Sequence, residues 1–310
     1  MPLAPEVMVS HDVARLADAV FRPRIEAALK AHDLTMFDYY TTTLNNADKT
    51  VSMGGNAPGA ARNTFGLNHA ISFLIESRGV GIGREGFQRR VATHYIAAKA
   101  VLETAAARAA ELRATVEAAR RAVSTDPANI VVAHTLNTRP VTLPLRDAES
   151  GEAKPTLVEF RDSRDVVPTV TRTPPAGYLV PAMSVEAIAV LRLNGIAFCR
   201  TTEPVDVEAD AFTIKERSRK VEREAINPDQ AIKVEVVRKR IKVPAGAAFV
   251  SARQPAGKLA SLALEPDSPG SLAGVGLIPL PDGLADIPVY RLATAPKLAP
   301  DEPRDAAVCR

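Results

Sequence analysis

The sequence contains little cysteine: Cys199 and Cys309 are the only two in 310 residues. Two cysteines supply neither the disulfide framework of a small secreted domain nor a cysteine-rich metal site. Cys199 lies in the apolar stretch I-A-F-C-R, which predicts a buried strand. We therefore predict that Cys199 is an inert thiol in the core.

Long apolar runs are also absent. No stretch approaches the eighteen or so apolar residues that a membrane helix needs. The first residues, M-P-L-A-P-E-V-M-V-S-H-D, lack the basic and apolar regions of a signal peptide. The chain as given is therefore expected to be soluble and to have no membrane partner, and its localisation stays unassigned.

A strong charge imbalance is missing as well, because the formal net charge is only +3. Two basic runs occur, K-E-R-S-R-K-V-E-R from Lys215 to Arg223 and R-K-R-I-K from Arg238 to Lys242. The first alternates with glutamate, and neither has aromatic residues on which bases could stack. Solvated edge-strand lysines explain them better, so we expect no nucleic-acid partner.

Helix signals dominate the first 125 residues. Ser10 is a good N-cap for a helix from about His11 to Ala31, which Pro23 interrupts. An alanine-rich stretch from about Glu85 to Val123 predicts a second, long helix. Its basic residues form the solvated side, and its large apolar residues recur on one face; these are Phe87, Val91, Tyr95, Ala98, Val101 and Leu102.

Short β-type runs dominate the rest. One strand is predicted earlier in the chain, at Leu34–Thr43. The later predicted strands are Ile130–Leu136, Val141–Leu145, Thr156–Phe160, Tyr178–Pro181, Ile196–Arg200, Phe212–Lys215 and Ile232–Val243. One amphipathic helix is expected from Ser184 to Asn194, with Gly195 as its stop. The sequence thus predicts an α/β fold: an α/β domain over residues 1–125, a smaller β-rich (α+β) domain over residues 126–293, and a disordered tail over residues 294–310.

The segment around Glu76 is the candidate for chemistry. Ala70 to Ile75 form a short apolar run that predicts a buried strand, and Gly79, Gly81 and Gly83 follow closely. Catalytic groups collect at the C-terminal ends of strands in open α/β sheets. Glu76 is therefore a candidate general base with Arg78 as its charge partner, although structural ion pairs also occupy such places.

These residues carry a resemblance to a known family. This part of the chain resembles the last third of an M14-type zinc carboxypeptidase domain from the bacterial branch of the family. The resemblance is carried by F-L-I-E-S-R-G from Phe73 to Gly79, by G-G-N-A-P-G-A-A-R-N-T-F-G-L before it and by V-G-I-G-R-E-G-F-Q-R-R-V-A-T-H after it. Segments between Val243 and Pro269 are similar to the accessory tail of those relatives. The resemblance implies that residues 1–125 are the C-terminal portion of such a catalytic domain, and that Glu76 is the general base.

The resemblance also implies zinc, whose catalytic sites need three protein ligands. Two of them come in this family from an H-x-x-E motif, and none of the five histidines has a carboxylate three residues on. Only His69 is near Glu76, and an odd separation puts the two on opposite faces of a regular strand. We therefore expect the family cofactor zinc not to be held by this chain alone.

Two residues are candidates for contacting a peptide substrate: Arg62 and Asn63. A hydrogen-bonded loop anchor is an equally good interpretation of both. Arg78 is a candidate partner that keeps Glu76 ionised. Tyr39 and Tyr40 come too early in the chain to match the tyrosine that the family places before its base.

The resemblance implies zinc-dependent removal of C-terminal amino acids from peptides, with this chain inactive by itself. Two alternatives stay open. One is a non-catalytic binding or regulatory remnant, and the other is an aspartoacylase-like amidohydrolase of acylated amino acids. Because sheet strands of the family precede this segment, we also expect an exposed sheet edge through which the chain self-associates.

Overall fold

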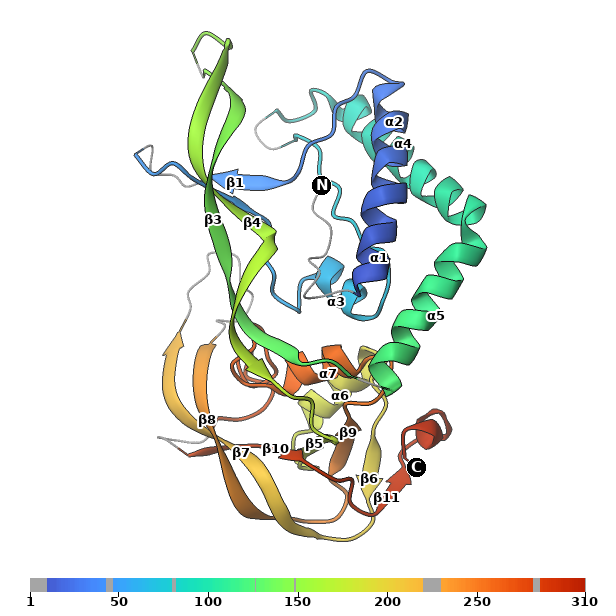
Figure 1. Cartoon of the computed structure of the whole chain (residues 1–310), viewed down its shortest axis with the longest axis vertical. Coiled ribbons are helices and arrows are strands. Elements are labelled where there is room, and N and C mark those ends of the chain that lie inside the picture. Colours follow the sequence, from blue (N-terminus) through green and yellow to red (C-terminus); the bar gives the residue numbers. More distant parts are fainter. Residues whose placement is uncertain are drawn as a thin grey trace. The chain divides into compact units, whose positions relative to one another are not determined.

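A computed structural model describes residues 10–42, 47–79, 82–125, 127–147, 149–219, 230–280 and 285–309. Gly81 and the end of the first basic run, residues 220–223, lie outside the described residues. The chain contains helices, a mixed four-stranded sheet and an antiparallel seven-stranded sheet, which confirms an α/β fold class (Figure 1). None of the helices within the described ranges has the length and apolar composition that a bilayer crossing requires.

Two compact units share the chain. The first comprises residues 1–56, 60–116 and 135–167, and the second comprises residues 57–59, 117–134 and 168–310. The chain therefore passes between the units more than once, and the long strands 130–146 and 153–172 contribute to both. The division at residue 125 into a catalytic portion and an accessory domain stays a prediction.

The first unit begins with a long helix, as predicted. It consists of α1 (His11–Leu16), a π-helical turn (Ala17–Phe21) and α2 (Arg22–Lys30), and the Ser10 hydroxyl accepts the Val13 N–H at 3.4 Å. The π-helical turn directly precedes Pro23, whose missing N–H cannot continue a regular ladder. α3 (Ala61–Leu67) and α4 (Phe87–Ala107) follow, and α5 (Ala109–Thr125) continues α4 after a break at Arg108.

The four-stranded sheet has the order β1-β2-β4-β3. Its strands are β1 (Tyr40–Thr42), β2 (Thr50–Met53), β3 (Ile130–Arg146) and β4 (Ala153–Arg172). β1 pairs antiparallel with β2, and β2 pairs parallel with β4, with Val51 opposite Phe160. Val51, Met53, Val158 and Phe160 form a small core on this sheet.

Two predicted strands of the first unit are corrected: one is shorter than expected and the other does not form. Of the strand expected at Leu34–Thr43 only β1 forms, and Thr43 lies outside the described residues. The buried strand expected at Ala70–Ile75 does not form: Phe73 makes an isolated bridge, and the segment belongs to neither sheet. Its apolar side chains pack on helices instead, with Phe73 and Ile75 against the Ile25, Leu29, Ala97 and Ala100 cluster that joins α2 to α4.

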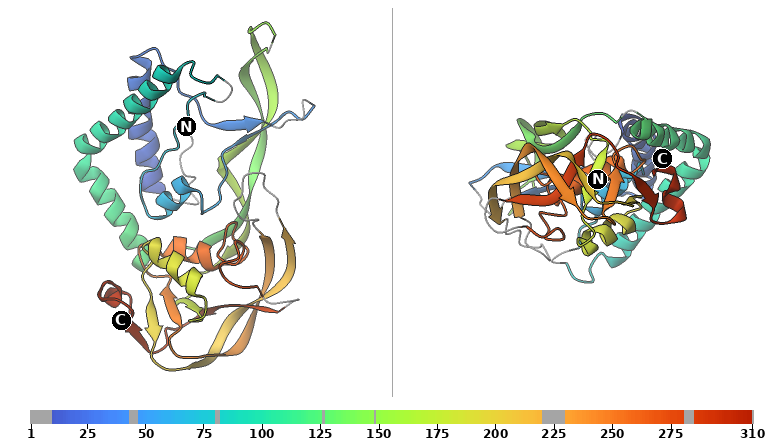
Figure 2. Two further views of the ribbon diagram at one scale, coloured as in Figure 1. Left: turned by 180° about the vertical axis from the view of Figure 1, so that it is seen from behind. Right: turned by 90° about the horizontal axis from the view of Figure 1, so that it is seen from below.

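The second unit is built on the seven-stranded sheet, in the order β11-β6-β9-β5-β10-β7-β8. Its elements are β5 (Gly177–Val180), α6 (Val185–Leu193), β6 (Cys199–Thr201), β7 (Val205–Arg219), β8 (Gln230–Val243), β9 (Ala248–Ser251), α7 (Gly257–Leu264), β10 (Asp286–Leu292) and β11 (Leu298–Pro300). α6 and α7 lie together on one side of this sheet (Figure 2). The predicted stop of α6 is confirmed, because Gly195 has φ 74°.

A buried ionic cluster holds the second unit together beside its apolar core. The fully buried Glu265 carboxylate accepts hydrogen bonds from the Tyr178 hydroxyl at 2.8 Å and from Arg172 at 2.7 Å, and Arg291 approaches it at 3.3 Å. Burial raises the pKa of the Glu265 carboxyl, and the two arginines oppose that rise. The cluster connects the end of α7 to β4, β5 and β10.

The expected core thiol and disordered tail are both corrected. Cys199 forms a disulfide with Cys309, with a Cα–Cα distance of 5.6 Å. β11 pairs antiparallel with β6, and a 3-10 helix (Pro303–Ala307) follows. Arg192 on α6 forms ion pairs with Asp301, Glu302 and Asp305, so side chains from distant parts of the chain order the Pro-rich segment.

We predict that Cys309→Ser lowers the free energy of unfolding by about 2–5 kcal/mol, because it opens a long covalent loop in the unfolded chain. Urea unfolding of the oxidised protein and of the variant measures the difference. Reduced wild-type protein serves as the matched control and should unfold like the variant. Two free thiols by titration of the non-reduced, denatured protein would contradict the assignment.

Candidate functional site

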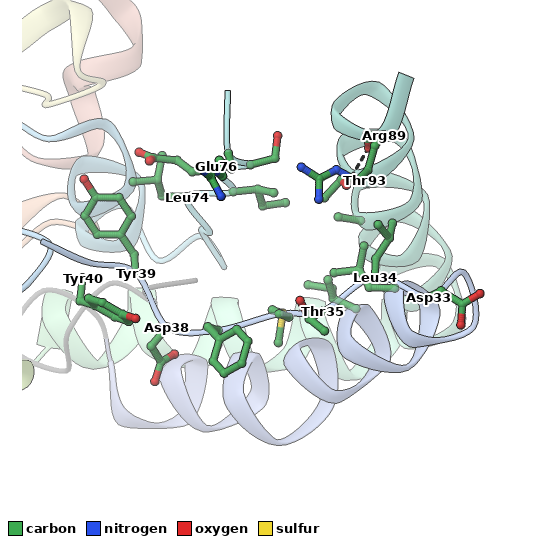
Figure 3. Close-up of a pocket in the computed structure, with 18 residues that line it drawn as sticks. Asp33, Leu34, Thr35, Asp38, Tyr39, Tyr40, Leu74, Glu76, Arg89 and Thr93 are labelled. Atoms are coloured by element: carbon green, nitrogen blue, oxygen red, sulfur yellow. Dashed lines mark hydrogen bonds between the residues drawn. The ribbon is translucent and has the colours of Figure 1, made fainter. Parts of the chain in front are cut away.

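A cavity of about 430 Å³ lies in the first unit. Two extended segments, residues 34–40 and 74–78, line it together with residues of α2 and α4 (Figure 3). Ile25, Leu29, Leu34 and Ala97 contribute apolar surface to its lining. Polar side chains from both segments occupy the rest, so the cavity combines an apolar wall with groups that can bind or react.

Glu76 lies in the lining of this cavity, as its candidacy requires. Phe73 and Ile75 pack against the cluster between α2 and α4, and the consecutive residues 74–78, Glu76 among them, line the cavity. Figure 3 shows Glu76 and Tyr39 at one end of the cavity and Arg89 with Thr93 at the other. Within the described part of the chain, the exposed Glu76 carboxylate has no hydrogen-bond or ion-pair partner.

Arg78 lines the same cavity and is also exposed. No ion pair joins Arg78 to Glu76, so the predicted charge partnership is not formed in this arrangement of the side chains. The shared cavity nevertheless puts a carboxylate and a guanidinium at one opening. The role of Arg78 in keeping Glu76 ionised stays a prediction.

Arg62 and Asn63 occupy the first turn of α3 and are buried. The Arg62 Nη2 donates to the Gly55 carbonyl at 2.7 Å, and the Asn63 Nδ2 donates to the same oxygen at 3.2 Å. Burial lowers the pKa of the Arg62 guanidinium, and Tyr39 opposes that change. These bonds anchor the loop before α3, which is the alternative role weighed from the sequence; neither residue lines the cavity.

Two lining residues carry chemistry that the sequence argument set aside. Tyr39, judged too early in the chain, lines the cavity with Glu76, and its ring lies beside Gly54 and Arg62. Arg89, assigned to the solvated side of α4, also lines the cavity. The sequence offered one indication of this role for Tyr39, the β-type run around it. That run reaches Glu76 only through contacts between residues far apart in the chain.

The donor set does not fit zinc. Among the described residues no three His, Cys, Asp or Glu side chains come together as a metal site would require. The His94 Nε2 lies 3.2 Å from the Ser77 hydroxyl, and the His32 Nδ1 lies 3.0 Å from the Ala28 carbonyl. His69 is buried and has φ 64°. These three histidines therefore lie in separate local environments.

Comparisons with known proteins agree with the resemblance at the level of a carboxypeptidase. No protein-family model matches the chain, and no solved structure matches it. Carboxypeptidase 2 of Trichophyton rubrum is 25% identical over 297 residues, covering 93% of this chain and 54% of the relative. Carboxypeptidase 2 of Trichophyton equinum is 24% identical with the same coverage, and probable carboxypeptidase 2 of Arthroderma benhamiae is 23% identical over 270 residues, covering 84% of this chain and 50% of the relative.

The chain therefore spans about half the length of these curated relatives. At this level of identity the matches support a carboxypeptidase family and no finer class. The chain is a distant relative of proteins named carboxypeptidase 2.

Proposed function

We propose that this chain is part of a carboxypeptidase-like peptide hydrolase and that Glu76 is its general base. The observation that carries the proposal is that Glu76 lines a cavity and has no ion pair with any described residue, at the position where the family resemblance expects the base. The distant relatives named carboxypeptidase 2 support the same class of reaction. Assignment to the M14 type and to its bacterial branch is the finer part of the proposal.

The chemistry asked of Glu76 is proton transfer. The carboxylate takes a proton from water as the water oxygen attacks the peptide carbonyl carbon, and then passes it to the amine nitrogen as the C–N bond breaks. Since Glu76 is exposed and forms no ion pair with the part of the chain that the structure describes, both of its oxygens are available for this task. Because the described donors do not fit zinc, no step is assigned here to a metal.

Glu76→Gln tests the proposal in a chimera in which this chain replaces the aligned 54% of the Trichophyton rubrum protein. We expect the chimera to release C-terminal residues from peptides, and the variant to lose about 100-fold or more in kcat, because an amide cannot accept the proton. Mass spectrometry of peptides with a free or an amidated C-terminus measures the release. Glu85→Gln, a neighbouring exposed carboxylate, is the matched control and should keep full activity.

The isolated chain is predicted to bind no stoichiometric zinc and to show no carboxypeptidase turnover. Metal analysis of protein purified without chelators, followed by dialysis against zinc, provides the measurement. A finding of about one tightly held zinc per chain would overturn the prediction and require a ligand set outside the groups described above.

Arg62 and Asn63 are proposed to serve the substrate indirectly, by holding the loop at Gly55 before α3. Arg62→Ala should lower the free energy of unfolding by about 1–3 kcal/mol, because the Gly55 carbonyl loses its shorter hydrogen bond. Thermal unfolding of the chain and KM of the chimera are measured together. A rise in KM with unchanged unfolding would instead favour the direct substrate contact predicted from the sequence.

A non-catalytic binding module is the second candidate function. The absence of a three-donor metal group among the described residues favours it. A chimera that folds but releases no C-terminal residue would select this candidate. No observation separately favours the amidohydrolase of acylated amino acids, which stays a prediction from the resemblance.

A further inference from the structure

The cavity of the first unit is lined by charged side chains of both signs. Arg78 and Arg89 line it together with Glu76, and all three are exposed. Among the described residues none of these three side chains has a hydrogen bond or an ion pair. The proposed proton transfer uses only the carboxylate and leaves both guanidinium groups without a role. A cavity that gathers charges without pairing them offers them to the charges of a ligand.

The other carboxylates of the lining do not share this property. The Arg22 Nη2 lies 2.8 Å from the Asp38 Oδ1, and the Arg164 Nη1 lies 3.4 Å from the Asp38 Oδ2. Two guanidinium groups therefore already neutralise Asp38. Figure 3 shows Asp33 with its carboxylate pointing away from the other lining side chains. Glu76 is thus the carboxylate that remains to bind a cationic group inside the cavity.

The two arginines lie at a common junction. Arg78 and Arg89 line the cavity and also line a second hollow, together with Ile82, Glu85 and Gly86. Glu85 makes no ion pair with either arginine in the described structure. Neighbouring guanidinium groups repel each other, and an anionic group held between them removes that repulsion. A carboxylate suits this place, because guanidinium N–H groups can bind both of its oxygens at once.

The charges of opposite sign belong to different ends of one small cavity. Figure 3 shows Glu76 with Tyr39 at one end, and Arg89 with Thr93 at the other. The cavity volume of about 430 Å³ is at the lower end of the range for ligand pockets, about 300–1,000 Å³. The two ends are therefore matched by a small molecule that itself carries one cationic and one anionic group.

Part of the lining is apolar and selects the body of the ligand. Burying apolar surface of the ligand against it is favourable, whereas a charged group placed there would lose its hydration. The residues that provide this surface come from α2, α4 and the segment between α2 and β1; they are Ile25, Leu29, Leu34, Met36 and Ala97.

We propose that this cavity binds a free apolar amino acid, such as leucine, in its zwitterionic form. The carboxylate of the ligand pairs with Arg78 and Arg89, its ammonium group pairs with Glu76, and its side chain contacts the apolar lining. A fatty acid would leave Glu76 without a partner, and an alkylamine would leave both arginines without one. That such an amino acid competes with a peptide for the cavity rests on the proposed function, whereas the binding itself does not.

Isothermal titration calorimetry of the full chain with L-leucine tests the inference. We expect saturable one-to-one binding. 4-Methylpentanoate lacks the ammonium group and 3-methylbutylamine lacks the carboxylate, so each should bind about tenfold more weakly or worse. L-Glutamate should be weakened about as much, because it brings a charge to the apolar lining.

Variants of the chain assign the two ends of the cavity. Glu76→Gln and Arg89→Gln should each weaken the binding of L-leucine about tenfold or more, because each removes one charge-assisted contact. Both side chains are exposed, so thermal unfolding of the variants should match that of the wild type. Arg84→Gln changes an exposed arginine in the turn before α4 that does not line the cavity. It is the matched control and should leave the binding unchanged.

Failure of L-leucine to bind saturably overturns the inference. Equal binding of 4-methylpentanoate overturns it in favour of a site for carboxylates alone, and equal weakening by Arg84→Gln overturns it in favour of unspecific charge attraction. L-Alanyl-L-leucine separates the inference from the proposed function. A dipeptide that binds more tightly than L-leucine overturns the inference and leaves the hydrolase standing. L-leucine binding together with a chimera that releases no C-terminal residue supports the inference and counts against the hydrolase.

Discussion

Packing of segment 70–77 on the paired helices α2 and α4 is the constraint on which the candidate site depends. Phe73 and Ile75 pack against the cluster of Ile25, Leu29, Ala97 and Ala100. This contact holds residues 74–78, Glu76 among them, in the lining of the cavity. Among the described residues the Glu76 carboxylate has no ion-pair partner, which is compatible with the proton transfer that we propose for it.

The same packing has a cost. The helices satisfy one side of the segment, while its strand-like backbone joins no sheet in the described chain, and the opposite face of α4 keeps four large apolar side chains in solvent. The second unit shows the contrast. There Glu265, Tyr178 and Arg172 satisfy one another in the interior, and β11 covers the outer edge of β6 under a disulfide.

The resemblance makes Glu76 the general base, which stays a prediction, and the structure shows that Glu76 lines a cavity. A zinc hydrolase needs three donors around one point, and the described side chains supply no such group. The curated relatives have about twice the length that this chain covers.

Sequence reasoning placed Glu76 and Arg78 in one neighbourhood, because only two positions separate them along the chain. It also located Arg62 and Asn63 together, although their shared bond to the Gly55 carbonyl assigns them to the loop anchor that was weighed beside substrate contact. Tyr39 and Arg89 escaped notice because residues 34–40 and α4 come together with the segment around one cavity only through contacts between distant residues. No periodicity along the chain encodes that approach.

Local signals by themselves determined the long helix after Ser10 and the end of α6 at Gly195, since caps and glycine act over a few residues. Tertiary structure alone decided that Cys199 pairs with Cys309, that the Pro-rich tail is ordered, and that α4 buries its alanines rather than its large apolar residues. Each of these outcomes depends on which distant surface is present to be contacted, and short-range preferences carry no information about that surface.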